Sequence, residues 1–312
     1  MRFTAADFGG GCGVWGMQDV PSQAGRVAVV TGASAGIGFA TAKALADRGC
    51  HVVLAVRDPA RGADAAARIG GSTAVTRLDL AALDSIRSAA AELTGGYPRI
   101  DLLINNAGAW SATRAETRDG FEMQLGVNHL GHFAFTGLLL NAMLGTPGSR
   151  IVTVSSVSHR AGAVDLGDLP MRHTYRHAAA YSRSKLANLL FAFELHRRLT
   201  QAGAATSSLA AHPGGVWTGL FRGANPAVLV HTLGRMITQS PEQGALATLR
   251  AATDPAATGG QYYGPSGIGE LRGAPKLVRA SPAAHDPAQA RHLWTESERL
   301  TGVTFEPILR ST

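Results

Sequence analysis

The chain has 312 residues, 45% of them hydrophobic and 16% charged, which is typical of a globular protein and excludes disorder as its main state. Its two cysteines, Cys12 and Cys50, exclude a disulfide scaffold and a cysteine-rich zinc site. The net charge is +7, but the basic residues are scattered, so we expect no nucleic-acid partner.

Residues 1–24 are predicted to form a poorly ordered leader, because glycine and polar residues occur there without clear periodicity. The leader shows no basic region followed by a long apolar run, so no secretory signal is visible and a cytoplasmic location is expected. The longest apolar stretches, such as 133–144, fall short of the roughly 20 residues that a membrane span needs.

Beyond Gly25, short apolar runs alternate with segments of helical periodicity. Predicted strands cover residues 26–31, 51–56, 73–78, 100–105, 151–155, 206–211 and 261–263. Predicted helices cover residues 37–48, 59–69, 84–93, 119–144 and 181–199, and one more begins at Ser240. Such alternation is typical of an α/β fold with parallel strands and helices on both faces. The sequence therefore predicts a single doubly wound domain over residues 25–305, with a mainly parallel seven-stranded sheet and a tail at 306–312.

The segment TGASAGIG, from Thr31 to Gly38, joins the first predicted strand to the first predicted helix. Its glycines allow a tight turn and a close approach to a pyrophosphate, and the helix N-terminus offers free N–H groups to the phosphates. The succession of strand, glycine turn and helix therefore predicts a dinucleotide site. The expected contacts are Gly32, Ser34, Ala35, Gly36, Ile37 and Gly38.

The end of the second predicted strand, Leu54-Ala55-Val56-Arg57, indicates which dinucleotide binds. An acidic residue there would accept hydrogen bonds from the ribose 2′-hydroxyl of NAD, whereas an arginine would pair with the 2′-phosphate of NADP. Because Arg57 follows an apolar strand end, NADP(H) is the expected cofactor and NAD(H) is the weaker alternative. A solvated loop charge is the other interpretation of Arg57.

Tyr181 and Lys185 lie four residues apart in a predicted helix and therefore share one face. A free phenol has a pKa of about 10, which a neighbouring cation lowers toward the range useful for proton transfer near neutral pH. Lysine occurs at only three positions, in an Arg- and Ala-rich composition typical of bacteria with GC-rich genomes. A lysine at this spacing is therefore informative, and the pair predicts proton transfer to or from a substrate oxygen.

The glycine spacing resembles that of the short-chain dehydrogenase/reductase family, and other motifs of that family follow in order over about residues 25–305. These motifs are Asn105-Asn106-Ala107-Gly108, Asn128, Ser155-Ser156, Tyr181 with Lys185, and Pro213-Gly214. The resemblance implies a Rossmann-like fold and an NADP(H)-dependent oxidoreductase that interconverts an alcohol and a ketone or aldehyde. It implies as catalytic residues Asn128, Ser156, Tyr181 and Lys185. It implies as further cofactor contacts Asp79, Leu80, Asn106, Ala107, Gly108, Tyr181, Lys185, Pro213, Gly214, Val216 and Thr218.

The family match also implies a role for each catalytic side chain. Ser156 would hold the substrate oxygen, Lys185 would bind the nicotinamide ribose, and Asn128 would hold a water that links Lys185 to solvent. The choice of Ser156 over its neighbour rests on the resemblance alone. Asp79 matches the position that contacts adenine, although its spacing fits a helix cap equally well. Ala35 stands where many NADP-using relatives have a basic residue, which implies a modest preference for NADP.

The gap of 25 residues between Ser156 and Tyr181 is similar to that of the retinol dehydrogenase-like and protochlorophyllide reductase-like branch. Residues 217–236 mix apolar residues with helix breakers, which predicts a lid and favours a lipophilic substrate. Two alternatives stay open: NADPH-dependent reduction of a carbon–carbon double bond, and NADP(H) sensing without turnover. The resemblance further implies a homodimer or homotetramer built on the helix that holds Tyr181, although some relatives are monomers.

Histidines occur in two close pairs, His129 with His132 and His173 with His177. Neither pair has carboxylates or cysteines beside it in a pattern that fits a metal site. We therefore expect no metal, and we expect the partner of the site to be a small organic substrate.

Overall fold

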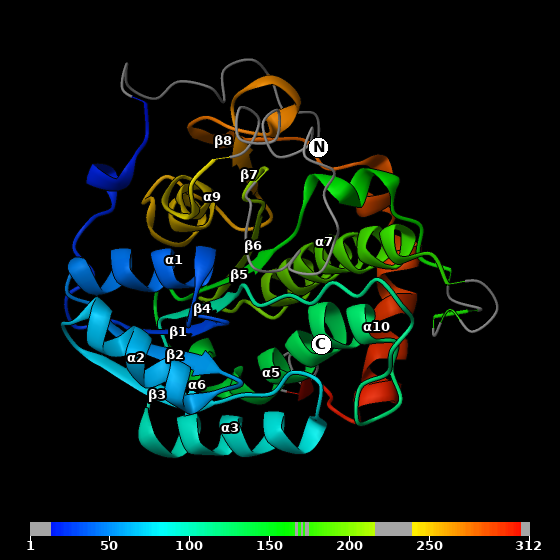
Figure 1. Ribbon diagram of the computed structural model, residues 1–312, viewed down its shortest axis with the longest axis horizontal. Helices are drawn as coiled ribbons and strands as arrows, with labels where there is room; N and C mark the ends of the chain where they lie inside the picture. The colour runs from blue at the N-terminus through cyan, green and yellow to red at the C-terminus, as the bar shows by residue number, and fades with distance from the viewer. Residues whose placement is uncertain (1–13, 166–167, 170, 172–174, 216–238, 307–312) are drawn as a thin grey trace.

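The computed structural model describes residues 14–165, 168–169, 171, 175–215 and 239–306. An eight-stranded sheet lies at its centre, with the strand order β3-β2-β1-β4-β5-β6-β7-β8 (Figure 1). Its strands are β1 Val27–Thr31, β2 His51–Val56, β3 Thr73–Arg77, β4 Leu102–Asn105, β5 Arg150–Val154, β6 Ser207–Ala211, β7 Tyr262–Pro265 and β8 Pro275–Leu277. The strands β1 to β7 run parallel, and β8 is antiparallel to β7.

The predicted single domain with a mainly parallel, doubly wound sheet is confirmed. The inner strands are buried almost throughout, which is why they read as continuous apolar runs in the sequence. The sheet has one strand more than predicted, since β8 was not anticipated. Two of the three residues of β8 are exposed, so the sequence of this edge strand contains no apolar run from which the strand could be predicted.

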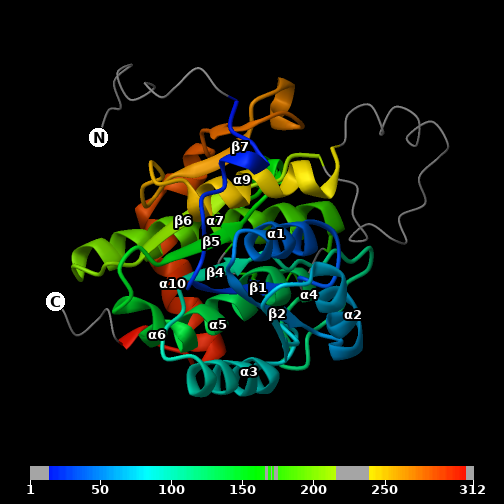
Figure 2. The same cartoon turned by 90° about the vertical axis from the view of Figure 1, so that its left-hand side faces the viewer.

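Helices cover both faces of the sheet. They are α1 Gly36–Asp47, α2 Pro59–Ile69, α3 Leu83–Gly96, α4 Met123–Leu125, α5 Gly131–Leu139, α6 Asn141–Leu144, α7 His177–Gln201, α9 Pro241–Thr253 and α10 Pro287–Thr301. In Figures 1 and 2, α1 and α9 lie together on one side of the strands, and α3, α5 and α10 lie on the other. Strand order reverses between β1 and β4, so a ligand crevice is expected at the carboxyl ends of these two strands.

The predicted continuous helix over residues 119–144 is wrong in one respect that matters for the site. The helical segment starts only at Met123, with α4. A π-helical turn follows at Gly126–Leu130, and the segment then continues as α5 and α6. A π turn accommodates an extra residue and is frequent at functional sites. Apolar periodicity could not reveal it, because the residues on both sides of the turn are equally apolar.

The C-terminal helix α10 packs against α5 and α7, on the side of these helices that faces away from the sheet. Four aromatic rings fill this contact, with ring centroids between 4.5 and 6.3 Å apart: Phe133, Phe191, Trp294 and Phe305. Gly137 permits the close approach, because a Cβ there would lie 2.8 Å from Val303 and 2.9 Å from Phe305. The outer faces of α5 and α7 are therefore part of the core.

Part of the expected leader packs against the domain. Within residues 14–24, Val20 is buried in the cluster of apolar side chains beneath α1, and a short 3₁₀ helix covers Met17–Asp19. The guanidinium of Arg48 donates hydrogen bonds to the carbonyls of Met17 and Gln18, both at 3.0 Å. Residues 1–13 lie outside the described part of the chain.

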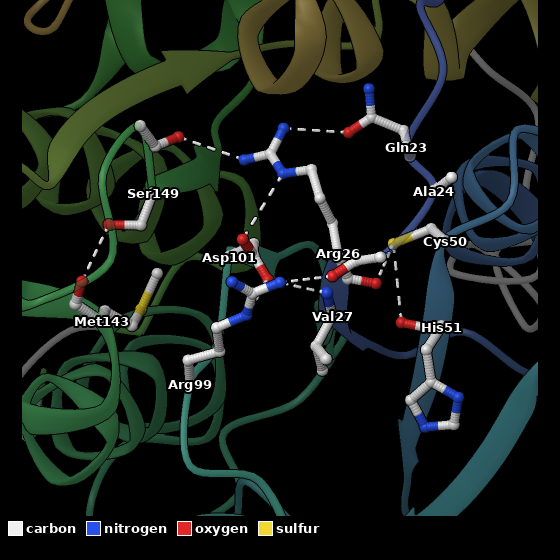
Figure 3. A network of polar contacts seen from close by, with 12 residues as sticks. Gln23, Ala24, Arg26, Val27, Cys50, His51, Arg99, Asp101, Met143 and Ser149 are labelled. Carbon is white, nitrogen blue, oxygen red and sulfur yellow. Dashed lines mark hydrogen bonds and ion pairs between the residues drawn. The ribbon is translucent and has the colours of Figure 1, made fainter.

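A polar network joins the amino ends of β1 and β4, opposite the ligand crevice (Figure 3). The Asp101 carboxylate accepts a hydrogen bond from the Val27 N–H at 2.8 Å. It forms ion pairs of 3.7 Å with Arg26 and Arg99. The Cys50 thiol lies beside this network and donates to the carbonyl of Arg26 at 3.3 Å. The network fixes the relative position of the two strands between which the strand order reverses.

Candidate active site

The glycine turn after β1 is packed directly against the turn after β4. Gly32 and Gly36 have φ values of +69° and +58°, which favour glycine. A Cβ on Gly38 would lie 2.5 Å from both the Asn106 amide nitrogen and the Gly32 carbonyl oxygen, so no larger residue fits there. The backbone at the end of β1 is therefore held close to the Asn105–Gly108 turn, as a dinucleotide-binding turn requires.

The N-terminus of α1 is left without a cap by the protein itself. Ala35 occupies the N-cap position and makes no side-chain hydrogen bond, and the first turn contains no acidic residue. The first N–H groups of a helix have no partner within the helix, and together with the helix dipole they favour an anion. The turn therefore fits a phosphate group, and Ser34, Ala35, Gly36 and Ile37 are the residues that could hold it.

The two asparagines of the Asn105–Gly108 turn hold the ends of neighbouring elements together. Asn106 donates from its side chain to the Thr31 carbonyl at 2.8 Å, and the N–H groups of Asn106 and Ala107 both donate to the Thr31 hydroxyl at 2.9 Å. Asn105 donates to the Thr136 hydroxyl of α5 at 2.9 Å. Both side chains are thus used to position neighbouring elements.

The two serines after β5 have different partners. The Ser155 hydroxyl donates to the Lys185 carbonyl at 2.8 Å and so joins β5 to α7. The Ser156 hydroxyl caps the next 3₁₀ helix, Val157–Ala161, and is hydrogen-bonded to the Tyr181 side chain. The structure therefore brings Ser156, and not Ser155, to the phenol.

The electrostatics of the tyrosine and lysine differ from the sequence-based expectation. Burial raises the pKa of Tyr181 to about 12, against a lowering by its hydrogen bond with Ser156. Burial likewise lowers the pKa of Lys185 to about 8. The Lys185 ammonium lies 5.7 Å from the centre of the Tyr181 ring and donates to the Val154 carbonyl at 3.2 Å. The predicted acidification of the phenol is therefore wrong for this state of the protein, because desolvation dominates.

Asn128 lies in the π turn and connects three segments of the site. Its side-chain oxygen accepts from the Ala109 N–H at 2.6 Å, and its amide donates to the Ala109 carbonyl at 3.0 Å and to the Ser184 hydroxyl at 2.9 Å. Ser184 in turn donates to the Tyr181 carbonyl at 2.8 Å. Both amide protons are used by protein groups, and the expected water relay stays a prediction.

The remaining predicted cofactor contacts lie around the same edge of the sheet. Arg57 is exposed two residues beyond Ala55, which pairs with Thr31 at the start of the glycine turn. Asp79 accepts a hydrogen bond from the Ala81 N–H at 3.1 Å in the turn before α3, but it does not cap that helix, whose N-cap position is Ala82. Leu80 is buried, with its carbonyl in close contact with the helix start at Gly131.

The turn after β6 places Pro213 and Gly214 beside a charged cluster that the sequence did not suggest. Gly214 has a φ of +71°, and its N–H donates to His212 Nδ1 at 3.3 Å. His212 donates from Nε2 to Glu270 at 3.1 Å, and Arg160 donates to the same carboxylate at 2.8 Å. Burial would raise the pKa of Glu270, but the hydrogen bonds from His212 and Arg160 outweigh it and lower the pKa to about 2.

The predicted contacts Val216 and Thr218, and the predicted lid at 217–236, lie outside the described residues.

In the part of the chain that the structure describes, no group of three or more His, Cys, Asp or Glu residues could hold a metal ion. His129 is bonded through Nε2 to Ser297 of α10 at 2.9 Å. Over the same described residues, none of the helices combines the length and the apolar character of a membrane span.

Sequence comparisons identify relatives over most of the chain. A family model described as short chain dehydrogenase matches residues 26–228. Polyprenol dehydrogenase of Mus musculus is 43% identical over 297 residues, covering 91% of this chain and 86% of that protein. Retinol dehydrogenase 13 of Homo sapiens is 40% identical over 300 residues, covering 91% of this chain and 87% of that protein.

Two solved structures are similar in fold. An uncharacterized protein from Mycobacterium paratuberculosis is 42% identical with a TM-score of 0.80, and the match covers 94% of this chain and 99% of that chain. RhlG from Pseudomonas aeruginosa, solved as an active-site complex with NADP, is 25% identical with a TM-score of 0.64, over 77% of this chain and 94% of that chain. With a family model that matches most of its length, this chain belongs to the short-chain dehydrogenase/reductase family of oxidoreductases.

Proposed function

We propose that this oxidoreductase uses NADP(H) to interconvert an alcohol and a ketone or aldehyde on a lipophilic substrate. The observation that carries the proposal is the hydrogen bond between the side chains of Ser156 and Tyr181, with the buried ammonium of Lys185 beside them. These groups come from the segment after β5 and from α7. The uncapped N-terminus of α1 lies at the carboxyl end of the same sheet.

The side chains suit the reduction of a carbonyl. The bound coenzyme would supply the hydride, and the oxygen that becomes an alkoxide would need a proton. Burial keeps Tyr181 protonated at neutral pH, so the phenol is a proton donor, and Ser156 can hydrogen-bond to the same oxygen. Below its pKa of about 8, Lys185 carries a positive charge that stabilises the phenolate left after the transfer.

Two features support NADP(H) as the coenzyme. Arg57 is exposed at the carboxyl end of β2, beside the glycine turn, where a guanidinium can pair with a 2′-phosphate. RhlG, a similar structure, was solved with NADP. We expect Arg57→Ala to reduce the NADPH/NADH ratio of kcat/KM about 10-fold, corresponding to ~1.4 kcal/mol. An unchanged ratio would show that the arginine is only a solvated loop charge.

The substrate class is inferred from relatives and from the rim of the site. Polyprenol dehydrogenase and retinol dehydrogenase 13 are named for alcohols with long hydrocarbon portions. The Trp110 ring lies edge-on to His177 with a centroid distance of 5.3 Å, one turn before Tyr181 on α7. An aromatic side chain at this place suits an apolar substrate.

The test is NADPH oxidation at 340 nm with a panel of lipophilic ketones and aldehydes. Tyr181→Phe should retain NADPH binding and lose turnover by about 10²–10⁴-fold, the usual contribution of general acid catalysis. Tyr97→Phe is the matched control, since Tyr97 bonds to His51 at the far end of the sheet. Full activity of Tyr181→Phe would reject the mechanism.

Product analysis distinguishes the alternatives. A saturated carbonyl product would indicate reduction of a carbon–carbon double bond, and tight NADPH binding without turnover on any substrate would indicate a sensor. The contact between Ser156 and Tyr181 favours the carbonyl reaction, because a sensor has no need of a proton donor there. A cytoplasmic location and a bacterial source stay predictions from the sequence.

A further inference from the structure

His132 is a buried side chain of α5 that bridges the two halves of the site. Its Nε2 lies 2.9 Å from the Thr31 hydroxyl at the end of β1. Its Nδ1 lies 3.1 Å from the carbonyl oxygen of Asn128 in the π turn. The ring therefore spans from the strand that precedes the glycine turn to the segment that supports α7, and both its nitrogens are used.

The other hydrogen bonds of Thr31 determine whether its hydroxyl donates to His132 Nε2 or accepts from it. Its hydroxyl oxygen already accepts the N–H groups of Asn106 and Ala107, both at 2.9 Å. These two donors occupy both lone pairs of the oxygen, which leaves the hydroxyl proton to be donated. The acceptors within reach are His132 Nε2 at 2.9 Å and the Ile104 carbonyl at 3.3 Å, so the shorter bond goes to the ring.

The tautomer of His132 follows from these contacts. A proton on Nε2 would give the Thr31 oxygen a third donor and would leave the Nδ1 lone pair facing the Asn128 carbonyl. A proton on Nδ1 satisfies both ends, since Thr31 then donates to Nε2 and Nδ1 donates to Asn128. Burial, together with the charge of Lys185, lowers the pKa of His132 to about 4 against the effect of the Asn128 bond, so the ring is neutral.

A continuous series of hydrogen bonds runs through this ring. It starts at the Asn106-Ala107 turn, passes through Thr31 and His132 to the Asn128 backbone, and continues from the Asn128 amide to Ser184. Ser184 donates to the carbonyl of Tyr181. Every connection is a direct bond of 3.1 Å or less between buried or half-buried groups. Movement of the coenzyme-binding turn is thereby linked to the backbone that carries the phenol.

We propose that His132 is a positioning residue, which holds the Asn128 carbonyl and thereby sets the place of Tyr181 relative to the coenzyme-binding turn. The inference rests on the proposed function for its kinetic consequence, but the bridge itself does not. The proposed positioning role predicts that losing the bond from Nδ1 to Asn128 lowers kcat more than losing the volume of the ring does. Thr31 can turn to the Ile104 carbonyl when the ring is lost, whereas the described residues provide no second side-chain donor to the Asn128 carbonyl.

Two substitutions separate these contributions. In His132→Asn the side-chain amide nitrogen takes the place of Nδ1 and can still donate to Asn128, although the side chain is much smaller. In His132→Gln the longer side chain reaches the place of Nε2 and fills more of the space, but it loses the donor to Asn128. A space-filling role therefore predicts that Gln is tolerated better, and a positioning role predicts that Asn is.

The experiment measures kcat, NADPH affinity and hydrogen exchange for both variants. We expect His132→Gln to lower kcat at least 10-fold and His132→Asn to lower it less than 5-fold, with the NADPH Kd of each within about 3-fold of the wild type. His129→Gln is the control, because this neighbouring buried histidine bonds to Ser297 instead. It should lower Tm without a comparable loss of kcat.

Hydrogen exchange of the ligand-free protein tests the bridge without any turnover. Peptides covering residues 105–110 and 177–185 should both exchange about 10-fold faster in His132→Gln, and should keep near wild-type protection in His132→Asn. If the wild type reduced no substrate, the proposed function would fail, yet this comparison would still decide on His132. An Asn variant that is as impaired as the Gln variant, in kcat or in exchange, would overturn the proposal.

Discussion

Arg183 stands between Tyr181 and Lys185 in the sequence, yet it points away from them into a buried ion pair. Its guanidinium lies 3.5 Å from the Glu122 carboxylate, and the two side chains are 3% and 0% exposed. The two Glu122 oxygens also accept from the N–H groups of Gln124 and Leu125, both at 2.8 Å, which caps α4. The pair therefore ties α7 to the start of the helical segment that holds the π turn.

Arg183→Met is expected to destabilise the protein by about 3–5 kcal/mol, because it leaves the Glu122 charge buried without its partner. The unfolding entropy of about 2.1 cal/mol/K per residue gives ~0.65 kcal/mol/K for a chain of 312 residues. The expected decrease in Tm is therefore about 5–8 °C. The double variant Glu122→Gln with Arg183→Met removes both charges and should recover most of this loss.

The assay is thermal unfolding followed by circular dichroism at low protein concentration. The matched control is Arg299→Met, which breaks the pair with Glu296, where the arginine side chain is 65% exposed. An exposed pair contributes less than about 1 kcal/mol, so its Tm should change by less than about 2 °C. If Arg183→Met changed Tm no more than this control, or if the double variant were the least stable, the argument from burial would be refuted.

Other predictions concern the site, the thiol and the oligomeric state. Ser156→Ala should reduce kcat at least 10-fold and lower Tm only slightly, through loss of the cap on a short 3₁₀ helix. Ser155→Ala, which removes the buried bond to the Lys185 carbonyl, should lower Tm without a comparable loss of kcat, and the reverse pattern would exchange their roles. In carbonyl reduction, kcat/KM should be constant up to about pH 8 and fall above it, because Lys185 has a pKa of about 8 and loses its charge there. Tyr181, with a pKa of about 12, keeps its proton over this range. A constant kcat/KM up to pH 10 would contradict this prediction. Burial raises the pKa of the Cys50 thiol to about 12. Iodoacetamide at pH 8 should therefore label Cys50 at least about 100-fold more slowly in the native protein than in the urea-unfolded protein, and peptide mass mapping measures the two rates. Because α10 covers the outer faces of α5 and α7, we expect ultracentrifugation to find a monomer, in contrast to the dimer or tetramer that the resemblance implies. A dimer that persists at low micromolar concentration would contradict this expectation.

The fold was predictable where local signals coincide with burial. Strands covered on both faces gave continuous apolar runs, and the glycine turn carries its own backbone requirement at Gly32 and Gly36. The helix α10 was missed although its ends were marked, since Asp286 caps it, Pro287 opens it and Gly302 closes it with a φ of +62°. Its polar outer face obscured the apolar residues that contact α5 and α7.

The sequence brought candidate site residues to attention more readily than it indicated their electrostatics. Tyr181 and Lys185 were proposed from their spacing and Ser156 from the family resemblance, but the direction of the phenol pKa depends on burial, which no local pattern reveals. His132 was interpreted as one half of a histidine pair. Its partner Thr31 lies 101 residues away, so only the folded chain shows that the ring is a bridge.

The pKa values also bear on the direction of the reaction. Raising the pKa of Tyr181 from 10.0 to about 12 leaves about a hundredfold less phenolate at any neutral pH. Carbonyl reduction starts from the neutral phenol and gains from this, whereas alcohol oxidation must first remove the proton. Lys185 compensates in part, because its charge favours the phenolate, but the ammonium is itself weakened by burial. In the ligand-free site the phenol is therefore protonated at neutral pH, which is the form from which carbonyl reduction starts.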